Sequence, residues 1–143
     1  MTEGRHPRHL GRVAVFQALY SHHISDERPE KIIDDLQERY NFDSTTKKYV
    51  TSLFVRSIEN KNFIVETVSK YLENWEWNRV ALLDRLILQL AVAELFYIDD
   101  VPPKVTIAEA IEIAKLYSTN DSSAFVNGIL DAIYKEQSSQ KDG

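Results

Sequence analysis

Apolar residues recur at intervals of three and four positions along most of the chain, a period typical of amphipathic α-helices. The spacing predicts a first helix over about residues 7–24. Its buried stripe is expected to contain Val13, Phe16, Tyr20 and Ile24. A short second helix should follow from Pro29 to about Tyr40, because proline is well suited to the first turn of a helix.

The middle of the chain continues with the same helical period. A segment over residues 44–73 is either one long helix or two helices with a break near residues 60–62, and Asp43 or Ser44 can cap its start. The most apolar stretch comes next, with the sequence RVALLDRLILQLAVAELFYI. A helix that is apolar around nearly its whole circumference lies at the centre of a fold, and we place Leu90 at the centre of the core.

Two more helices are predicted towards the C-terminus. Thr106 and Glu109 have the spacing of a capping box, so a helix is expected to begin at Thr106 and to end near Tyr117. Asn120 or Asp121 should cap a last helix, and Gly128 inside it is expected to mark close packing against another backbone.

The scarcity of chain-breaking residues sets the fold class. Only 4 glycines and 4 prolines occur among 143 residues, which disfavours architectures of strands and tight turns. An apolar fraction of 43% is sufficient for one core. We therefore expect an all-α fold with a single domain of about six to seven helices over residues 1–136. The polar sequence QSSQKDG, residues 137–143, is expected to be a disordered tail.

Several classes of function are disfavoured by what the sequence lacks. The chain has no cysteine, and it contains neither a P-loop, nor a nucleophile elbow, nor a dinucleotide fingerprint. Its four histidines lie on or before the first predicted helix, with only Glu3 nearby at a metal-binding spacing. No stretch of the sequence approaches the about 18 consecutive apolar residues of a membrane span. The basic N-terminus is not followed by the apolar segment that a signal peptide requires. We therefore expect a cytoplasmic protein that is not an enzyme. It should have no catalytic residues and bind no metal or cofactor.

Positive charge is concentrated at the N-terminus of a chain whose net charge is −5. Cations in the first turn of a helix oppose its macrodipole, so their position there suggests a function such as contact with RNA phosphates. The candidate phosphate contacts are Arg5, Arg8, His9 and Arg12. The candidate stacking surfaces for unpaired bases are Tyr20, Tyr71 and Phe125. The alternative for the aromatic residues is core packing, and for the arginines a flexible, solvated arm.

Several separated motifs, in order and over nearly the whole chain, resemble the NusB family. They comprise QALY near the N-terminus, AxxEL, a D-x-P-x-K-V turn, an EAxExAK helix and FVNGxLD. These motifs lie at Gln17–Tyr20, Ala91–Leu95, Asp100–Val105, Glu109–Lys115 and Phe125–Asp131. The first helix departs from the pattern, since Pro7, Leu10 and Gly11 interrupt the dense arginine run of many relatives.

The resemblance implies a fold of two packed helical bundles and a role in transcription antitermination. Family members bind boxA RNA together with NusE, a small-subunit ribosomal protein, within the antitermination complex of RNA polymerase. By motif match, the implied RNA contacts are Arg8, His9, Arg12, Tyr20, Tyr71, Asp121 and Phe125. The implied partner surface includes Arg79, Asp84 and Arg85. The alternative is a protein-only scaffold or a homodimer in which the RNA surface is occluded.

Overall fold

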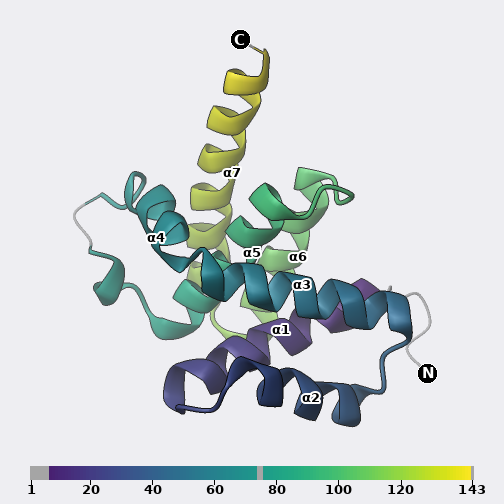
Figure 1. Ribbon diagram of the computed structural model, residues 1–143. Helices are drawn as coiled ribbons and strands as arrows, with labels where there is room; N and C mark the ends of the chain where they lie inside the picture. Colours follow the sequence, from purple (N-terminus) through teal and green to yellow (C-terminus); the bar gives the residue numbers. More distant parts are fainter. Residues whose placement is uncertain (1–6, 74–75, 143) are drawn as a thin grey trace.

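The computed structural model describes residues 7–73 and 76–142, and within them it contains helices and no strand (Figure 1). The helices in chain order are α1 (Pro7–Ile24), α2 (Pro29–Tyr40), α3 (Ser44–Glu59), α4 (Lys61–Ser69), the 3₁₀ turn η1 (Trp77–Arg79), α5 (Leu82–Tyr97), α6 (Pro103–Tyr117) and α7 (Asn120–Asp142). The all-α prediction is confirmed. Arg5, a predicted RNA contact, lies outside the described residues.

The helices form two bundles that share α5. Helices α1, α2 and α3 pack on one another, while α4, α6 and α7 each pack against α5. In Figure 1 the first group lies below the second, and α7 extends beyond both. Because α5 also contacts α1 and α3, its apolar circumference joins the two groups into one core.

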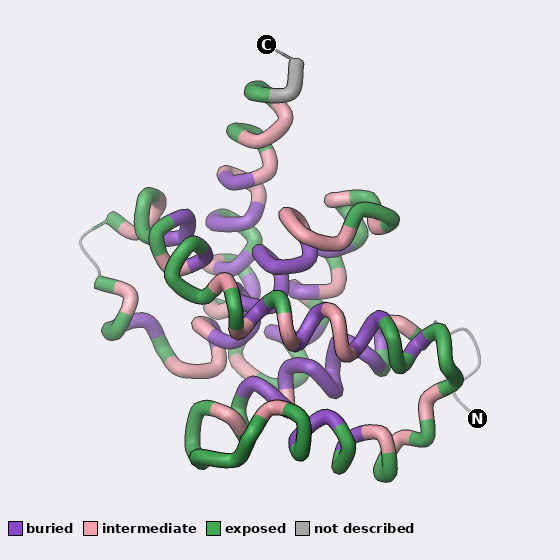
Figure 2. Tube along the Cα trace, in the orientation of Figure 1, coloured by how far each residue is buried: buried purple, intermediate pink, exposed green. Residues whose placement is uncertain are grey.

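Helix α5 is the central helix, as its composition predicts. Its middle turns are buried on all sides (Figure 2), and Leu90 is only 1% exposed. Leu88, Ala91, Val92 and Ala93 are fully buried as well. A helix with neighbours on every side has no polar face to present to water, which explains its continuous run of apolar residues.

Local signals account for the helix boundaries in the first half. Pro29 is the first residue of α2, and the Asp43 carboxylate caps α3 by accepting a hydrogen bond of 2.8 Å from the Thr46 amide. Residues 44–73 hold two helices, α3 and α4, with the break at Asn60, where φ is −107° and ψ is 21°. The Arg56 carbonyl accepts hydrogen bonds from both the backbone amide of Asn60 at 3.1 Å and its side-chain amide at 3.0 Å, which holds the end of α3 at this residue.

The predicted capping box at Thr106 is wrong. Helix α6 begins one turn earlier, at Pro103, where proline lacks only an amide hydrogen that the first turn leaves unpaired anyway. Thr106 lies inside the helix, 2% exposed, and its hydroxyl donates to the Glu94 carboxylate at 2.6 Å. The Thr106 side chain therefore bonds to another helix, α5, instead of capping α6.

Two other expectations are corrected, one about the buried stripe of α1 and one about Gly128 on α7. Tyr20 and Ile24 are 41% and 62% exposed, so the buried stripe of α1 ends before them. The tightly packed glycine is Gly11, where a Cβ atom would lie 3.0 Å from the side-chain atom Cγ2 of Val50 on α3. A Cβ at Gly128 would meet nothing within 4 Å.

Helix α7 is longer than the sequence pattern indicates. It continues through Asp142, so residues 137–142 are helical where a disordered tail was expected. The segment from Lys135 to Gln137 contains good helix formers, and the Gln137 amide reaches the Leu95 carbonyl at 3.5 Å. These features extend the helix beyond its last buried residue, Ile133.

Candidate nucleic-acid interface

A buried carboxylate, that of Glu94 in α5, organises the start of α1. It is 1% exposed and accepts hydrogen bonds from Arg12 Nε at 2.9 and 3.2 Å. The hydroxyls of Thr106 on α6 and Tyr49 on α3 donate to the same carboxylate. Burial, and then the nearby charge of Glu94, raises the pKa of Tyr49, so its hydroxyl stays protonated and acts as a donor. One side chain thus ties α5 to three other helices.

Arg12 is therefore a structural residue in this fold, and its guanidinium is buried rather than open to phosphate. Its exposed fraction is 3%, and its guanidinium is held by Glu94. The sequence carries a signal for this pairing. Glu94 interrupts the most apolar segment of the chain, and Arg12 lies one turn from the buried Phe16. A charge on a buried face requires an opposite charge nearby.

His9 and Arg8 also have acidic partners. His9 is 6% exposed, and its Nδ1 lies 2.6 Å from Glu109 Oε2 on α6. Arg8 donates to both oxygens of Asp100 at 3.2 and 2.8 Å, and its guanidinium carbon lies 4.5 Å from the centre of the Tyr49 ring. The side chain of Arg8 keeps 23% of its surface exposed. Of the three predicted phosphate contacts in α1, Arg8 is the one that reaches solvent.

Replacing Arg8 by alanine is expected to raise the pKa of Asp100, because its hydrogen bonds with Arg8 hold that pKa below its usual range. A depressed carboxyl pKa stabilises the fold above the unfolded pKa of about 3.9, and this contribution is lost as pH falls through the folded pKa. The variant should lose at most about 1 kcal/mol near neutral pH, as is usual for exposed pairs. NMR titration of the Asp100 carboxyl measures the shift, and an unchanged pKa contradicts the pairing.

Phe125 on α7 lies in a groove together with predicted partner residues. This open groove has a volume of about 310 Å³ and is lined by Arg79, Val80, Ala81, Asp84 and Phe125. Phe125 is half-buried, so its ring contributes both to packing and to the surface. The structure thus joins a residue predicted to stack on bases with two residues, Arg79 and Asp84, predicted to contact a partner.

Asp84 has a defined structural environment beside this groove. Its carboxylate is 6% exposed and accepts hydrogen bonds from Ser118 at 3.3 Å and Ser122 at 3.1 Å. These bonds attach the start of α5 to the end of α6 and to the first turn of α7. Asp121, another predicted RNA contact, is exposed in that same first turn of α7.

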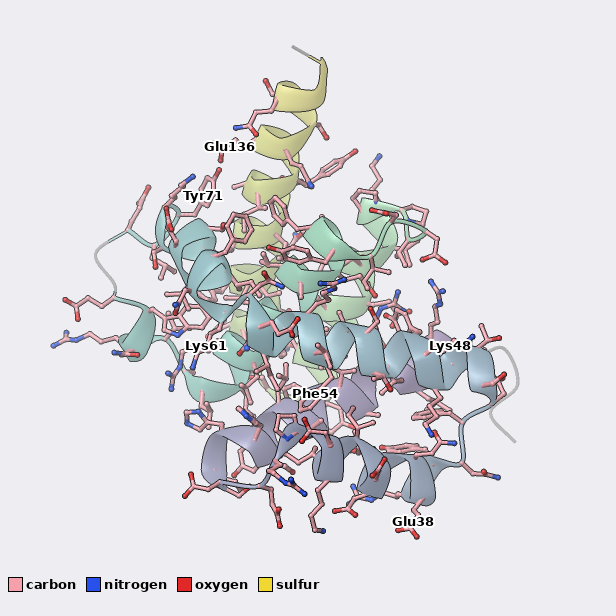
Figure 3. All side chains as sticks on the ribbon, viewed as in Figure 1. Glu38, Lys48, Phe54, Lys61, Tyr71 and Glu136 are labelled. Atoms are coloured by element: carbon pink, nitrogen blue, oxygen red, sulfur yellow. The ribbon has the colours of Figure 1, made fainter. Side chains whose placement is uncertain are left out.

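The other predicted residues lie elsewhere. Tyr20 is exposed on α1, while Tyr71 follows α4 and is half-buried. The Tyr71 hydroxyl donates to Glu136 on the projecting part of α7 (Figure 3). Arg85 does not line the groove of Phe125 but a separate pocket with Trp77. The predicted site residues are thus spread over several surfaces of α1, α4, α5 and α7.

The described part of the chain offers no site for metal chemistry. Residues 7–73 and 76–142 contain no group of three His, Asp or Glu side chains that could hold a metal ion. Within the same ranges, every helix is too short or too polar to cross a membrane. The arrangement consists of paired charges, an exposed tyrosine and an open groove with an aromatic ring, which are features of a binding surface.

Comparison with known proteins places the chain in a family. The family model described as "NusB family" matches residues 9–135. The chain belongs to the NusB family. Its fold, with two bundles around α5, agrees with the structures of other NusB proteins.

Three NusB relatives illustrate the similarity. The transcription antitermination protein NusB of Thermotoga maritima is 43% identical over 131 residues, which cover 91% of this chain and 92% of that protein. A solved structure of T. maritima NusB has a TM-score of 0.85 over 92% of this chain and 93% of that one. NusB of Chloroherpeton thalassium is 42% identical over 130 residues, and this chain spans only 62% of that longer protein. A solved complex of antitermination factors NusB and NusE with dsRNA contains a chain 26% identical, with a TM-score of 0.82 over 91% of this chain and 97% of that chain.

Proposed function

We propose that this NusB-family protein is a transcription antitermination factor that binds boxA RNA together with NusE. In this role it promotes read-through by RNA polymerase in ribosomal RNA operons. The observation that carries the proposal is the likeness, in sequence and fold, to proteins of that name, including one solved with NusE and dsRNA. Transcription in bacteria takes place in the cytoplasm, so the proposal places the protein there as a binding protein rather than an enzyme.

The proposed RNA surface comprises residues that reach solvent. Arg8, Tyr20, Asp121 and Phe125 are each at least partly accessible, and aromatic rings of this kind are stacking platforms for unpaired bases. Tyr71 and Arg5 complete the proposed set. His9 and Arg12 are positioning residues in this proposal. Their bonds to Glu109 and Glu94 hold the start of α1 against α6 and α5 and so fix the place of Arg8.

The charge distribution supports a requirement for a partner. The net charge is −5, and the described basic residues at the start of α1 are paired with Glu94, Asp100 and Glu109. Affinity for phosphates depends on the release of counterions by cations that are available to neutralise them. NusE would supply additional cations, and Arg79, Asp84 and Arg85 mark the proposed surface for it.

A ternary binding assay tests the function. Fluorescence anisotropy of labelled boxA RNA, titrated with the protein alone and with NusE, is expected to show tighter binding and stronger discrimination against scrambled RNA when NusE is present. Equal affinity for both RNAs in the presence of NusE contradicts the proposal. Sedimentation of the protein alone tests the alternative by measuring its oligomeric state. A stable homodimer that also fails to bind RNA in the anisotropy assay supports the protein-only scaffold.

Replacing Phe125 by leucine is expected to weaken binding of boxA RNA by about fivefold or more, because stacking of a base on a ring contributes about 1–3 kcal/mol. Leucine keeps an apolar side chain but removes the ring. Phe63→Leu is the matched control, because Phe63 is 41% exposed on α4 and does not line the groove. If Phe125→Leu leaves RNA affinity intact but costs several kcal/mol of stability, Phe125 belongs to the core alone.

A further inference from the structure

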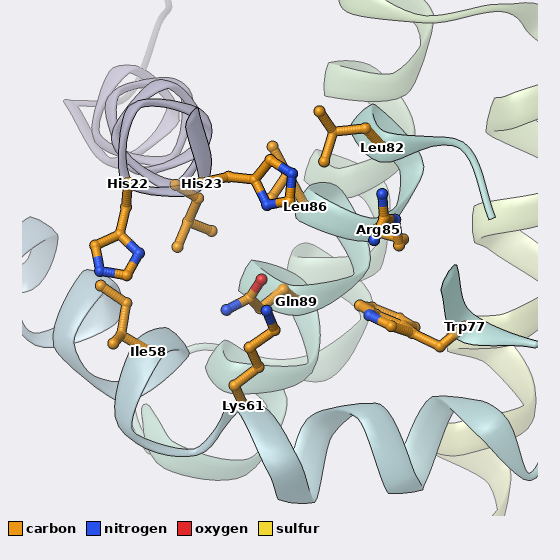
Figure 4. A pocket seen from close by; sticks show the side chains of 10 residues that line it. His22, His23, Ile58, Lys61, Trp77, Leu82, Arg85, Leu86 and Gln89 are labelled. Atoms are coloured by element: carbon orange, nitrogen blue, oxygen red, sulfur yellow. The ribbon is translucent and has the colours of Figure 1, made fainter. Parts of the chain in front are cut away.

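A pocket between the two bundles is lined by basic side chains from several elements. His23 comes from α1, Lys61 from α4, and Arg85 and Gln89 from α5, while Trp77 of η1 forms one edge (Figure 4). In the close-up these side chains surround one common space. The pocket is distinct from the groove of Phe125, with which it shares no residue.

The charge of this pocket is one-sided. His22, His23, Lys61 and Arg85 line it, and none of the described lining residues is Asp or Glu. The protein as a whole carries an excess of acidic residues, with a net charge of −5. Two of these residues, Lys61 and Arg85, are cations at neutral pH, and no described acidic side chain lines the pocket to balance them, so an anion between them is stabilised.

Arg85 has a donor without a partner. Its Nε atom is buried, and no described group accepts a hydrogen bond from it. A buried donor that is left unpaired is costly, and native structures rarely retain one without a ligand or water to satisfy it. The neighbouring Gln89 is fixed, because its amide donates to the Ser57 carbonyl at 2.9 Å and thereby joins α5 to α3.

The size of the pocket restricts the ligand to one small group. Its volume is about 60 Å³. A single water requires about 10–15 Å³ on the same measure, so the pocket has room for a few oxygen atoms and not for a nucleobase. Arginine, lysine and histidine together offer more donors than the two oxygens of a carboxylate use, and arginine's planar fork matches phosphate geometry.

We propose that this pocket binds a phosphate group through Arg85, Lys61 and His23. Its position suggests a source, which rests on the proposed RNA-binding function. His23 is one turn from the exposed Tyr20 on α1, and Arg85 follows Asp84, which lines the groove of Phe125. An RNA strand that stacks a base on Tyr20 is the proposed source, with one of its backbone phosphates in the pocket. Free inorganic phosphate has the same chemistry and is the other source.

The first experiment uses inorganic phosphate and the whole protein. Phosphate is titrated against chloride at constant ionic strength, and NMR follows the Trp77 indole N–H and the Arg85 Nε–H. We expect both signals to shift with saturation, and Lys61→Gln to weaken binding about tenfold, as loss of a hydrogen bond to a charged group does. Lys47→Gln is the matched control, because it removes the same charge from an exposed position on α3 outside this pocket.

The second experiment measures affinity for RNA in the presence of NusE. If the phosphate belongs to the RNA backbone, Lys61→Gln should weaken binding of boxA and scrambled RNA alike. It should also make the log–log salt dependence shallower by about 0.7, the value for one phosphate contact on a single strand. Weakened phosphate binding with unchanged RNA binding assigns the pocket to free phosphate.

Two results overturn the proposal. One is that Lys61→Gln and Arg85→Gln match Lys47→Gln in both experiments, and the other is that acetate binds the pocket as tightly as phosphate. Lys61 is exposed, so its variant keeps the test decisive even if Arg85→Gln fails to fold. If the unaltered protein with NusE binds no boxA RNA, the proposed function fails, while the phosphate titration still tests the pocket.

Discussion

Replacing Arg12 by alanine is expected to lower the free energy of unfolding by about 3–5 kcal/mol, the usual cost of removing one partner from a buried ion pair. Glu94 is 1% exposed and accepts two of its hydrogen bonds from Arg12 Nε. Without the guanidinium its charge remains in the core, and the hydroxyls of Thr106 and Tyr49 cannot neutralise it. Urea denaturation, monitored by circular dichroism, measures the change in unfolding free energy.

A double variant separates the buried charge from the loss of packing. In Arg12→Met with Glu94→Gln, both charges are removed, but an oxygen remains to accept hydrogen bonds from Thr106 and Tyr49. We expect this protein to recover most of the lost stability, because removing a buried pair altogether is often nearly neutral. A cost below about 1 kcal/mol for Arg12→Ala contradicts the buried pairing and makes Arg12 available for RNA.

Leu90→Ala is expected to destabilise the protein by about 2–5 kcal/mol, because it removes a large side chain from the interior and leaves a cavity. Leu90 is 1% exposed in the middle of α5, the helix that both bundles share. The control is Leu116→Ala on α6, where the side chain is 53% exposed and the cost should stay within about 0.5 kcal/mol. Similar costs for the two variants would contradict the central position of α5.

Local patterns were sufficient to predict the bounds of α1 and α2 and the central place of α5, but not the start of α6 or the end of α7. The bounds of α1 and α2 and the central helix follow from intervals of three and four residues and from proline at a first turn, whereas the structure decides that Asp43 rather than Ser44 caps α3. These features involve residues within a turn or two of one another, so the sequence alone determines them. The resemblance to the NusB family, carried by separated motifs, was equally visible in the sequence.

Tertiary structure decided which charged residues are buried and which acids they pair with. Arg12 and Glu94 are 82 positions apart in the chain, and only the packing of α1 on α5 brings them together. The same carboxylate accepts a hydrogen bond from the Thr106 hydroxyl, which therefore does not cap α6 as predicted. Whether a cation is buried or available depends on which helix covers it and which acid that helix carries.

The candidate site divides in the same way. The sequence by itself determined which residue types are available: basic residues at the start of α1 and aromatic residues on α1 and α7. Tertiary structure decided that Arg8 reaches solvent while His9 and Arg12 are buried, and that Phe125 shares a groove with Arg79. The physical reason is that helical periodicity depends on neighbours in the chain, whereas burial, ion pairing and grooves depend on contacts between helices far apart in it.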